Sequence, residues 1–155
     1  MGIQYPQAIK FHKKTAQLQF DLVRPKEEDN ATNGRKRIKD GCIFLSLAKA
    51  KQDGSDRMDW DNKINLKLDP ADIAEIVVKI RSNESAKLFH KSEAAGSTST
   101  LEVSQGDRPG TYKWFLSKTQ GENKNYGVIY LDKKDMFHLF VMFEAALPII
   151  SGWTA

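Results

Sequence analysis

The stretch MDWDNKINLKLDPADIAEIVVKIRSNESAKLFHK, residues 58–91, contains the signatures of a strand and a helix in direct succession. In its first part, Ile64, Leu66 and Leu68 alternate with lysine and asparagine residues. Alternation of apolar and polar residues is the pattern of a strand with one buried face. We therefore predict a strand over residues 57–68, immediately before the helix.

The helix in this stretch has clear start signals. Asp69 is a natural N-cap, Pro70 suits the first helical position, and Asp72 occupies the capping-box position. The apolar residues that follow recur at helical spacing, namely Ile73, Ile76, Val77 and Ile80. This spacing predicts an amphipathic helix with one polar, solvent-facing side.

Strands and turns are predicted on the N-terminal side of this stretch. Residues 15–24 alternate and predict a strand that ends at Pro25, and residues 26–34 are charged and predict a loop. Residues 35–51 predict two strands that form a hairpin through a turn at Asp40-Gly41.

A similar order follows on the C-terminal side. Residues 86–91, 100–105, 111–119 and 126–133 predict strands, and Asp132 caps a second helix. The chain therefore reads as four strands and a helix, twice. We expect a single α+β domain over residues 1–155, with two four-stranded antiparallel sheets and two helices.

The second helix lies in DMFHLFVMFEAALPIISGW, residues 135–153, and is apolar on every side. Its two polar interruptions, His138 and Glu144, lie about 120° apart on the helix circumference and cannot form one polar face. A helix that is apolar all round is buried all round. Either both sheets of a monomer enclose it, or it forms the core of a homo-oligomer. The expected interface residues are Met136, Phe137, Leu139, Phe140, Phe143 and Leu147.

Composition narrows the class of protein. The 155 residues are 40% hydrophobic and 28% charged, with a formal net charge of +4 and a pI of about 9.1. These values are typical of a soluble globular domain and suit a polyanionic partner. The single cysteine, Cys42, excludes an intramolecular disulfide and indicates a reducing compartment. No signal peptide or membrane span is recognisable, so we expect a cytoplasmic protein.

Three segments of the chain resemble the Whirly family of single-stranded DNA-binding proteins. They are KKTAQLQF, residues 13–20, the stretch of residues 58–91 quoted above, and KDMFHLFVMFEAALPIISGW, residues 134–153. The resemblance implies two four-stranded antiparallel sheets packed crosswise and held by helices. It also implies a homotetramer built around the C-terminal helices, which binds single strands along its sheets without strong sequence preference.

The chain departs from the family pattern in its lysine-rich first strand. Lys13 matches the first lysine of that motif, but Lys14 stands where glycine is usual and Thr15 where the second lysine is usual. These departures bear on the DNA contacts and on assembly beyond the tetramer. Plant members carry organelle transit peptides and this chain shows none, so we expect a bacterial or phage relative, or a mature form.

Single-strand binding requires cations along a groove and exposed aromatic rings on which bases stack. Tyr112 and Trp114 point to one face of their strand and Phe115 to the other, and sequence leaves open which face is core. Tyr126 and Tyr130 share the next strand. The residues expected to bind nucleic acid are Lys10, Lys13, Lys14, Arg35, Lys36, Arg37, Lys39, Tyr112, Lys113, Trp114, Lys118 and Tyr126.

Catalytic and cofactor motifs are not recognisable. The three histidines lack metal-ligand spacing, and no glycine-rich phosphate loop is present. We expect no enzyme, no metal and no cofactor. The favoured function is sequence-independent binding of single-stranded DNA in replication, recombination or repair. Three alternatives remain open: an RNA-binding module of the same fold, a scaffolding oligomer that binds no nucleic acid, and a nuclease that uses Asp59 and Asp61.

Overall fold

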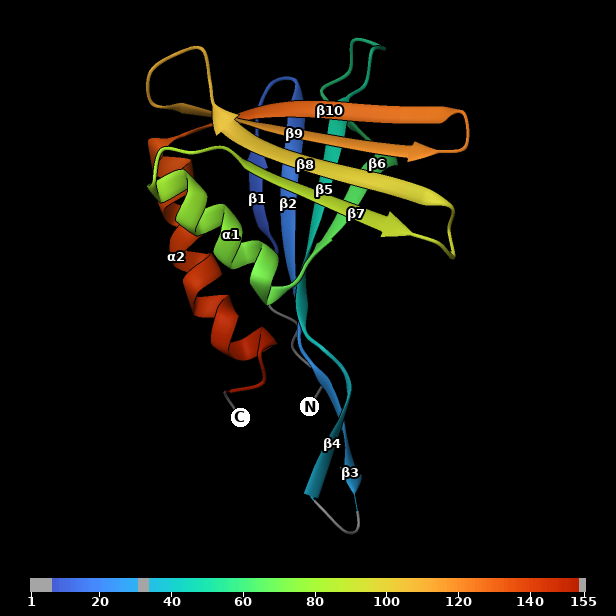
Figure 1. Ribbon diagram of the computed structural model, residues 1–155. Helices are drawn as coiled ribbons and strands as arrows, with labels where there is room; N and C mark the ends of the chain where they lie inside the picture. The colour runs from blue at the N-terminus through green and yellow to red at the C-terminus, as the bar shows by residue number, and fades with distance from the viewer. Residues whose placement is uncertain (1–6, 31–33, 154–155) are drawn as a thin grey trace.

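The computed structural model describes residues 7–30 and 34–153 and contains two crossed sheets, two helices and a projecting hairpin (Figure 1). The first sheet has the strand order β1-β2-β5-β6 and the second has the order β10-β9-β8-β7. All neighbouring strands are antiparallel. The predicted α+β class with two four-stranded sheets is confirmed.

The bounds of the elements follow the chain from sheet to sheet. The first sheet comprises β1 (Ile9–His12), β2 (Ala16–Val23), β5 (Cys42–Ala50) and β6 (Met58–Leu68). The second comprises β7 (Ala86–Ser92), β8 (Ser97–Gln105), β9 (Thr111–Gln120) and β10 (Asn123–Asp132). The helices are α1 (Pro70–Arg81) and α2 (Lys133–Ile150). The hairpin comprises β3 (Lys26–Asn30) and β4 (Gly34–Lys39).

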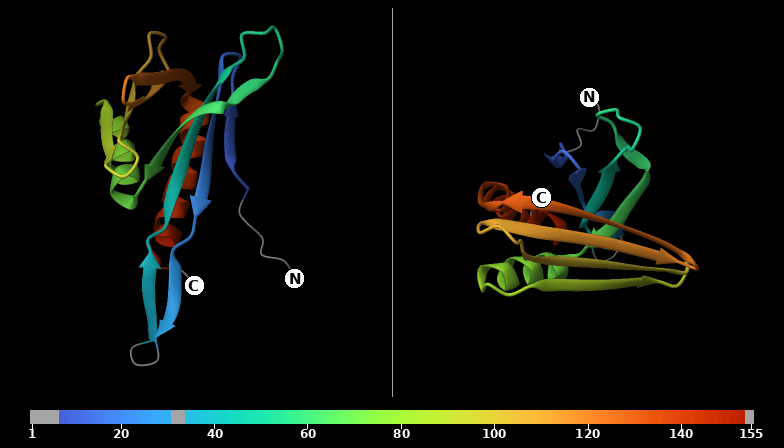
Figure 2. Two further views of the ribbon diagram at one scale, coloured as in Figure 1. Left: turned by 90° about the vertical axis from the view of Figure 1, so that its right-hand side faces the viewer. Right: turned by 90° about the horizontal axis from the view of Figure 1, so that it is seen from above.

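The hairpin corrects two sequence predictions. Residues 26–30 form β3 rather than a loop, and β4 pairs with β3 rather than with β5. The strand sequence Lys-Glu-Glu-Asp-Asn has a low intrinsic preference for β structure. The register places Glu27, Glu28 and Asp29 opposite positions 37, 36 and 35, so β3 takes its strand structure from its pairing with β4. Figures 1 and 2 show that this hairpin extends away from both sheets.

A second difference concerns the first sheet. Its edge strand β1 was not predicted, and it supplies the fourth strand that β4 was expected to provide. Two apolar residues of β1, Ile9 and Phe11, continue the inner face formed by β2. A strand of four residues shows too little alternation to stand out in the sequence.

The core lies where the inner faces of the two sheets and α2 meet. Phe20 of β2 makes edge-to-face contacts with Trp114 of β9 and Phe143 of α2, at centroid distances of 5.7 and 5.5 Å. The indole N–H of Trp114 points at the sulfur of Met136, with 3.3 Å between the nitrogen and sulfur atoms. Aromatic pairs of this geometry add to the free energy gained by burying their area.

The two sheets are in close contact at Gly127 of β10. A Cβ atom on this residue would collide with Cδ2 of Leu47 in β5. The side chain of Leu47 is buried. Glycine is therefore required here by close approach, because the leucine of one sheet rests against the backbone of the other.

Both helices begin with a capping box, where the sequence predicted the box of α1 and, for α2, only the cap Asp132. Asp69 and Asp132 accept hydrogen bonds from the N–H groups of Asp72 and Asp135, and the Asp72 and Asp135 carboxylates accept from the cap N–H groups in return. Satisfying these otherwise unpaired N–H groups stabilises the first turn of a helix.

Helix α2 is buried on one side and open on the other. Met136, Leu139, Phe140 and Phe143 are buried in the core of the same chain, which corrects the expectation that they form an intersubunit interface. Leu147 is half-buried, whereas Phe137 is 73% exposed. The two sheets therefore do not enclose this helix, and the apolar side that remains open is formed by Phe137, Val141 and Met142. No helix in the described part of the chain is long and apolar enough to cross a membrane.

Candidate nucleic-acid interface

The outer face of the second sheet carries a group of aromatic side chains. Strand alternation places Trp114 and Leu116 of β9 inward and Phe115 outward. In the register with β10, Phe115 lies opposite Val128 and next to the positions of Tyr126 and Tyr130. Phe89 of β7 projects from the same side of the sheet. We call Phe89, Phe115, Tyr126 and Tyr130 the aromatic face.

Rings of the aromatic face are accessible to a planar ligand. Phe89, Tyr126 and Tyr130 are 65%, 57% and 46% exposed. Phe115 stacks on Tyr126 with 6.2 Å between ring centroids and 30° between ring planes. Large apolar rings left in water on one side of a sheet mark an interaction surface, because folding alone would bury them.

Lysines lie among these rings. Lys87 and Lys91 flank Phe89 along β7, and Lys113 lies opposite Tyr130 in the β9–β10 register. From the first sheet, Lys49 places its Nζ atom 5.6 Å from the centre of the Tyr126 ring. Glu102 is a carboxylate on this face, opposite Lys87 and Phe115 in the strand register. Cations beside exposed rings can hold phosphates while bases stack.

The outer face of the first sheet is different in chemistry. It carries amides and hydroxyls that bond to one another, such as Ser46 Oγ to Asn65 Oδ1 at 2.9 Å and Gln19 Nε2 to Asp21 Oδ2 at 2.9 Å. Phe44 is the large apolar side chain on this face, at 38% exposure. The amides, the hydroxyl and the carboxylate named here have partners within the protein, and exposed Lys10 and Lys67 lie on the same face.

The structure separates the five residues predicted on β9 and β10. Lys113 and Tyr126 lie on the aromatic face. Trp114 is fully buried, so the prediction that it offers a stacking surface is wrong. Tyr112 and Lys118 share its inward-facing alternation, and Tyr112 packs against the core. Trp114 is inward because the bulkiest ring fills the junction with Phe20.

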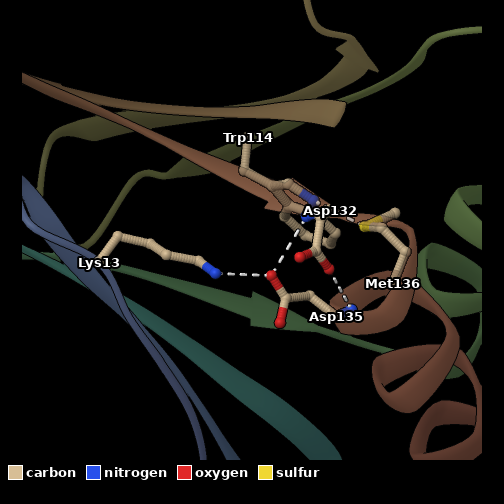
Figure 3. A network of polar contacts seen from close by, with 5 residues as sticks. All are labelled: Lys13, Trp114, Asp132, Asp135 and Met136. Atoms are coloured by element: carbon tan, nitrogen blue, oxygen red, sulfur yellow. Dashed lines mark hydrogen bonds and ion pairs between the residues drawn. The ribbon is translucent and has the colours of Figure 1, made fainter. Parts of the chain in front are cut away.

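Lys13 has a structural partner. Its Nζ atom lies 2.7 Å from Asp135 Oδ2, and the same carboxylate oxygen accepts the N–H of Asp132 (Figure 3). The pair therefore joins the β1–β2 turn to the start of α2. Lys10 and Lys14 are exposed near the same turn, away from the aromatic face.

The remaining predicted cations belong to the hairpin. The side chains of Arg35, Lys36 and Arg37 lie outside the part of the chain that the structure describes, whereas Lys39 is exposed at the end of β4. Their strand extends away from the second sheet (Figure 1), so the structure does not bring this cluster together with the aromatic face.

Sequence reasoning missed Lys87, Phe89 and Lys91 of this surface. It considered Tyr130 together with Tyr126, and it left open whether the face of Phe115 is core. The signal for the β7 residues was present. Lys87 and Phe89 alternate with Ala86 and Leu88, which are buried. Because one face of a strand with this pattern is core, its lysine and phenylalanine have to face outward.

The acidic and histidine side chains bear on the alternative of a metal-dependent enzyme. Within residues 7–30 and 34–153, no group of three or more histidine, cysteine, aspartate or glutamate side chains is placed to hold a metal ion. Asp59 accepts a hydrogen bond from Asn62. His90 Nε2 lies 3.1 Å from Asp72 Oδ2, and burial raises the pKa of the Asp72 carboxyl, with the N–H of Asp69 and the charge of His90 opposing that shift.

Comparison with known proteins gives the same fold. The family model described as Whirly transcription factor matches residues 11–121. The structure is similar to WHY1 from Arabidopsis thaliana, with a TM-score of 0.88 and 22% identity over 99% of this chain and 89% of that one. It is also similar to the plant transcriptional regulator PBF-2, with a TM-score of 0.85 and 19% identity over 98% and 86% of the two chains.

A more distant similarity links the fold to trypanosome proteins. The MRP1/MRP2 proteins of Trypanosoma brucei give a TM-score of 0.58 at 12% identity over 97% of this chain and 89% of that one. No curated protein sequence matches this chain significantly.

Proposed function

Because this chain belongs to the Whirly transcription factor family, we propose that it binds single-stranded DNA on its aromatic face, with little sequence preference. The observation that carries this proposal is the set of exposed rings, interspersed with lysines, on the outer face of the second sheet. The matching face of the first sheet lacks such a set in the described residues, so the assignment is specific to one sheet.

The proposed mechanism has two steps. Lysines first attract the phosphate backbone, which accounts for a strong dependence on salt. Bases then stack on the exposed rings, with roughly 1–3 kcal/mol per base. Every base has a π face, so stacking tolerates any sequence, and readout of base edges is not needed.

We further propose that the protein acts as a homotetramer on exposed strands during replication, recombination or repair. The open apolar side of α2 supports an assembly, because Phe137, Val141 and Met142 would otherwise remain in water. Four copies of a chain with a formal net charge of +4 would also strengthen the positive field that attracts a polyanion.

Fluorescence anisotropy tests the central proposal. A labelled, mixed-sequence single strand of about thirty nucleotides, long enough for several stacking sites, is titrated and then competed with duplex DNA. We expect tight binding that duplex DNA does not displace, with a log–log salt slope of about −0.7 per phosphate neutralised. Equal displacement by duplex DNA would contradict base stacking, and a flat salt response would contradict capture by lysines.

RNA is a second candidate ligand, and one observation favours it. β8 places hydroxyl groups of Thr98, Thr100 and Ser104 on the same side of the sheet as the rings. A hydroxyl near the backbone of a bound strand can bond to the 2′-OH that distinguishes RNA from DNA. Competition by an RNA strand of the same sequence decides between the two nucleic acids.

A further inference from the structure

A polar pocket lies beside the β8–β9 loop, at the end of the second sheet. Its volume is about 260 Å³, and its lining includes Asn83, Gln105, Arg108, Tyr112 and Lys133. These residues come from the end of α1, from β8, from β9 and its preceding loop, and from the start of α2. A pocket of this size is smaller than those that usually enclose a drug-sized ligand, and it suits a compact polar group.

The pocket contains two cations without a counterion. Arg108 and Lys133 are exposed, and neither side chain forms an ion pair or hydrogen bond with any other residue that the structure describes. Carboxylates do not line the pocket. The neighbouring carboxylate in sequence, Asp132, instead accepts the N–H of Asp135. The pocket therefore concentrates positive charge, and an anion held between the two side chains would relieve their mutual repulsion.

The backbone of the loop keeps these groups close to each other. Gly110 has a φ of +78°, and a Cβ atom there would lie 3.4 Å from Cε of Lys133. Glycine thus allows the loop to turn tightly and lets the lysine stem pack against it. The N–H and the hydroxyl of Thr111 both bond to the carbonyl of Arg108, which closes the loop.

Arg108 also connects this pocket to the aromatic face. A second hollow of about 340 Å³ adjoins the same loop and is lined by Asp107, Arg108, Thr111 and Tyr130. Arg108 lines both hollows, and Tyr130 is one of the exposed rings described above. Arg108 therefore lies beside the position that a base stacked on Tyr130 would occupy.

We propose that Arg108 and Lys133 form a phosphate-binding subsite that holds the backbone of the strand where it leaves Tyr130. This inference rests on the proposed function. The guanidinium of arginine binds phosphate through two parallel N–H donors, and a lysine ammonium binds it as a compact charge. The subsite would fix the position of the strand on the sheet, and the rings would hold its bases.

The test compares two double variants of equal charge. Arg108→Gln with Lys133→Gln removes the subsite, and Arg57→Gln with Lys63→Gln removes two exposed cations of the first sheet, on β6 and just before it. Each is titrated by anisotropy with the single strand of about thirty nucleotides over a range of salt concentrations. Thermal unfolding followed by circular dichroism checks that each variant folds.

The subsite predicts about tenfold weaker binding and a salt slope reduced by about 0.7 for the first variant only. Equal losses in both variants would overturn the subsite and leave the proposed function standing, because they would indicate general charge attraction. Unchanged binding by the first variant would also overturn it. Failure of the unmodified protein to bind the strand would overturn the proposed function and the subsite together.

Discussion

The N-terminal and C-terminal halves of this protein share one layout of four sheet strands and a helix, yet they expose opposite chemistry. The outer face of the first sheet carries amides and hydroxyls together with exposed Lys10 and Lys67, and α1 turns an ordinary charged side to solvent. The outer face of the second sheet carries exposed rings, and α2 leaves Phe137 in water. Each half buries its other face in the same core.

This difference shows that inward-facing residues determine the arrangement of strands and helices, whereas outward-facing residues determine what each half can bind. In both sheets every second side chain is apolar and points inward, and the burial of these side chains stabilises the fold. Folding does not constrain the outward positions. The rings and lysines at these positions are the reason that we assign binding to the second half. Variants of matched positions in the two halves can therefore break or sharpen this contrast.

The largest expected effect is on assembly. Phe137→Glu places a charge on the open side of α2, where burial without a partner would cost several kcal/mol at each copy of the interface. We expect this variant to be a folded monomer by sedimentation velocity. The control is Val78→Glu on α1, which is 62% exposed in the parent and should leave the assembly unchanged. If the Phe137 variant sediments like the parent, the open side of α2 is not an interface.

The next effect is on stability and distinguishes the two faces of β9. Trp114→Ala removes a fully buried ring that contacts Phe20 and Met136. We expect a loss of about 3–5 kcal/mol in the free energy of unfolding, measured by urea denaturation. Phe115→Ala, one residue along, should cost much less, because its side chain is only partly buried. Similar losses for both variants would contradict the assignment of the faces.

Binding affinity should separate the two sheets. Phe115→Ala or Tyr126→Ala should weaken single-strand binding by about 1–3 kcal/mol, since each removes one stacking surface. Phe44→Ala on the first sheet is the matched control and should bind like the parent. A loss of affinity for Phe44→Ala as large as for Phe115→Ala would mean that the strand runs over both sheets.

The smallest effect concerns one carboxyl from each capping box, Asp72 at the third position of α1 and Asp132 at the N-cap of α2. Burial raises the pKa of Asp72 on α1, whereas hydrogen bonding to the Asp135 N–H lowers the pKa of Asp132 on α2. Asp132 therefore contributes stability that is present above its ordinary pKa of about 3.9 and is lost as the pH falls through its lowered value. Asp72 does the opposite, because its ionisation in the folded state lowers stability as the pH rises.

Asparagine variants measure this contrast. As the pH rises through about 4, the stability of the parent relative to Asp132→Asn should increase, while its stability relative to Asp72→Asn should decrease. Urea unfolding at several pH values gives both differences. Parallel trends for the two variants would show that these two carboxyls titrate alike.

Most of the fold could be predicted from local patterns. Residues 57–91 contain alternation, a capping box and helical spacing in one run, and each signal is confirmed in β6 and α1. β3 could not be predicted in this way, since its charged sequence becomes a strand only through pairing with β4. Such a strand is stabilised by the strand it pairs with, and the pattern within its own few residues gives no information about that partner.

The candidate site was predictable only in part. On β9, aromatic residues occupy both faces, so alternation shows that one face is core without showing which. The choice depends on Phe20, which comes from a distant part of the chain and contacts both Trp114 and Phe143 of α2. The buried residues of α2 illustrate the same limit, because a helix that is apolar all round does not reveal which side its own sheets cover.

The contact between Leu47 and Gly127 has a consequence for the history of this protein. Each sheet occupies the space that the other would need for one more methyl group, so neither position can enlarge alone. Among homologues, we expect these two sites to covary, with a side chain at position 127 accompanied by a smaller residue at position 47. A lineage that changed one without the other would have to alter the angle at which its sheets cross.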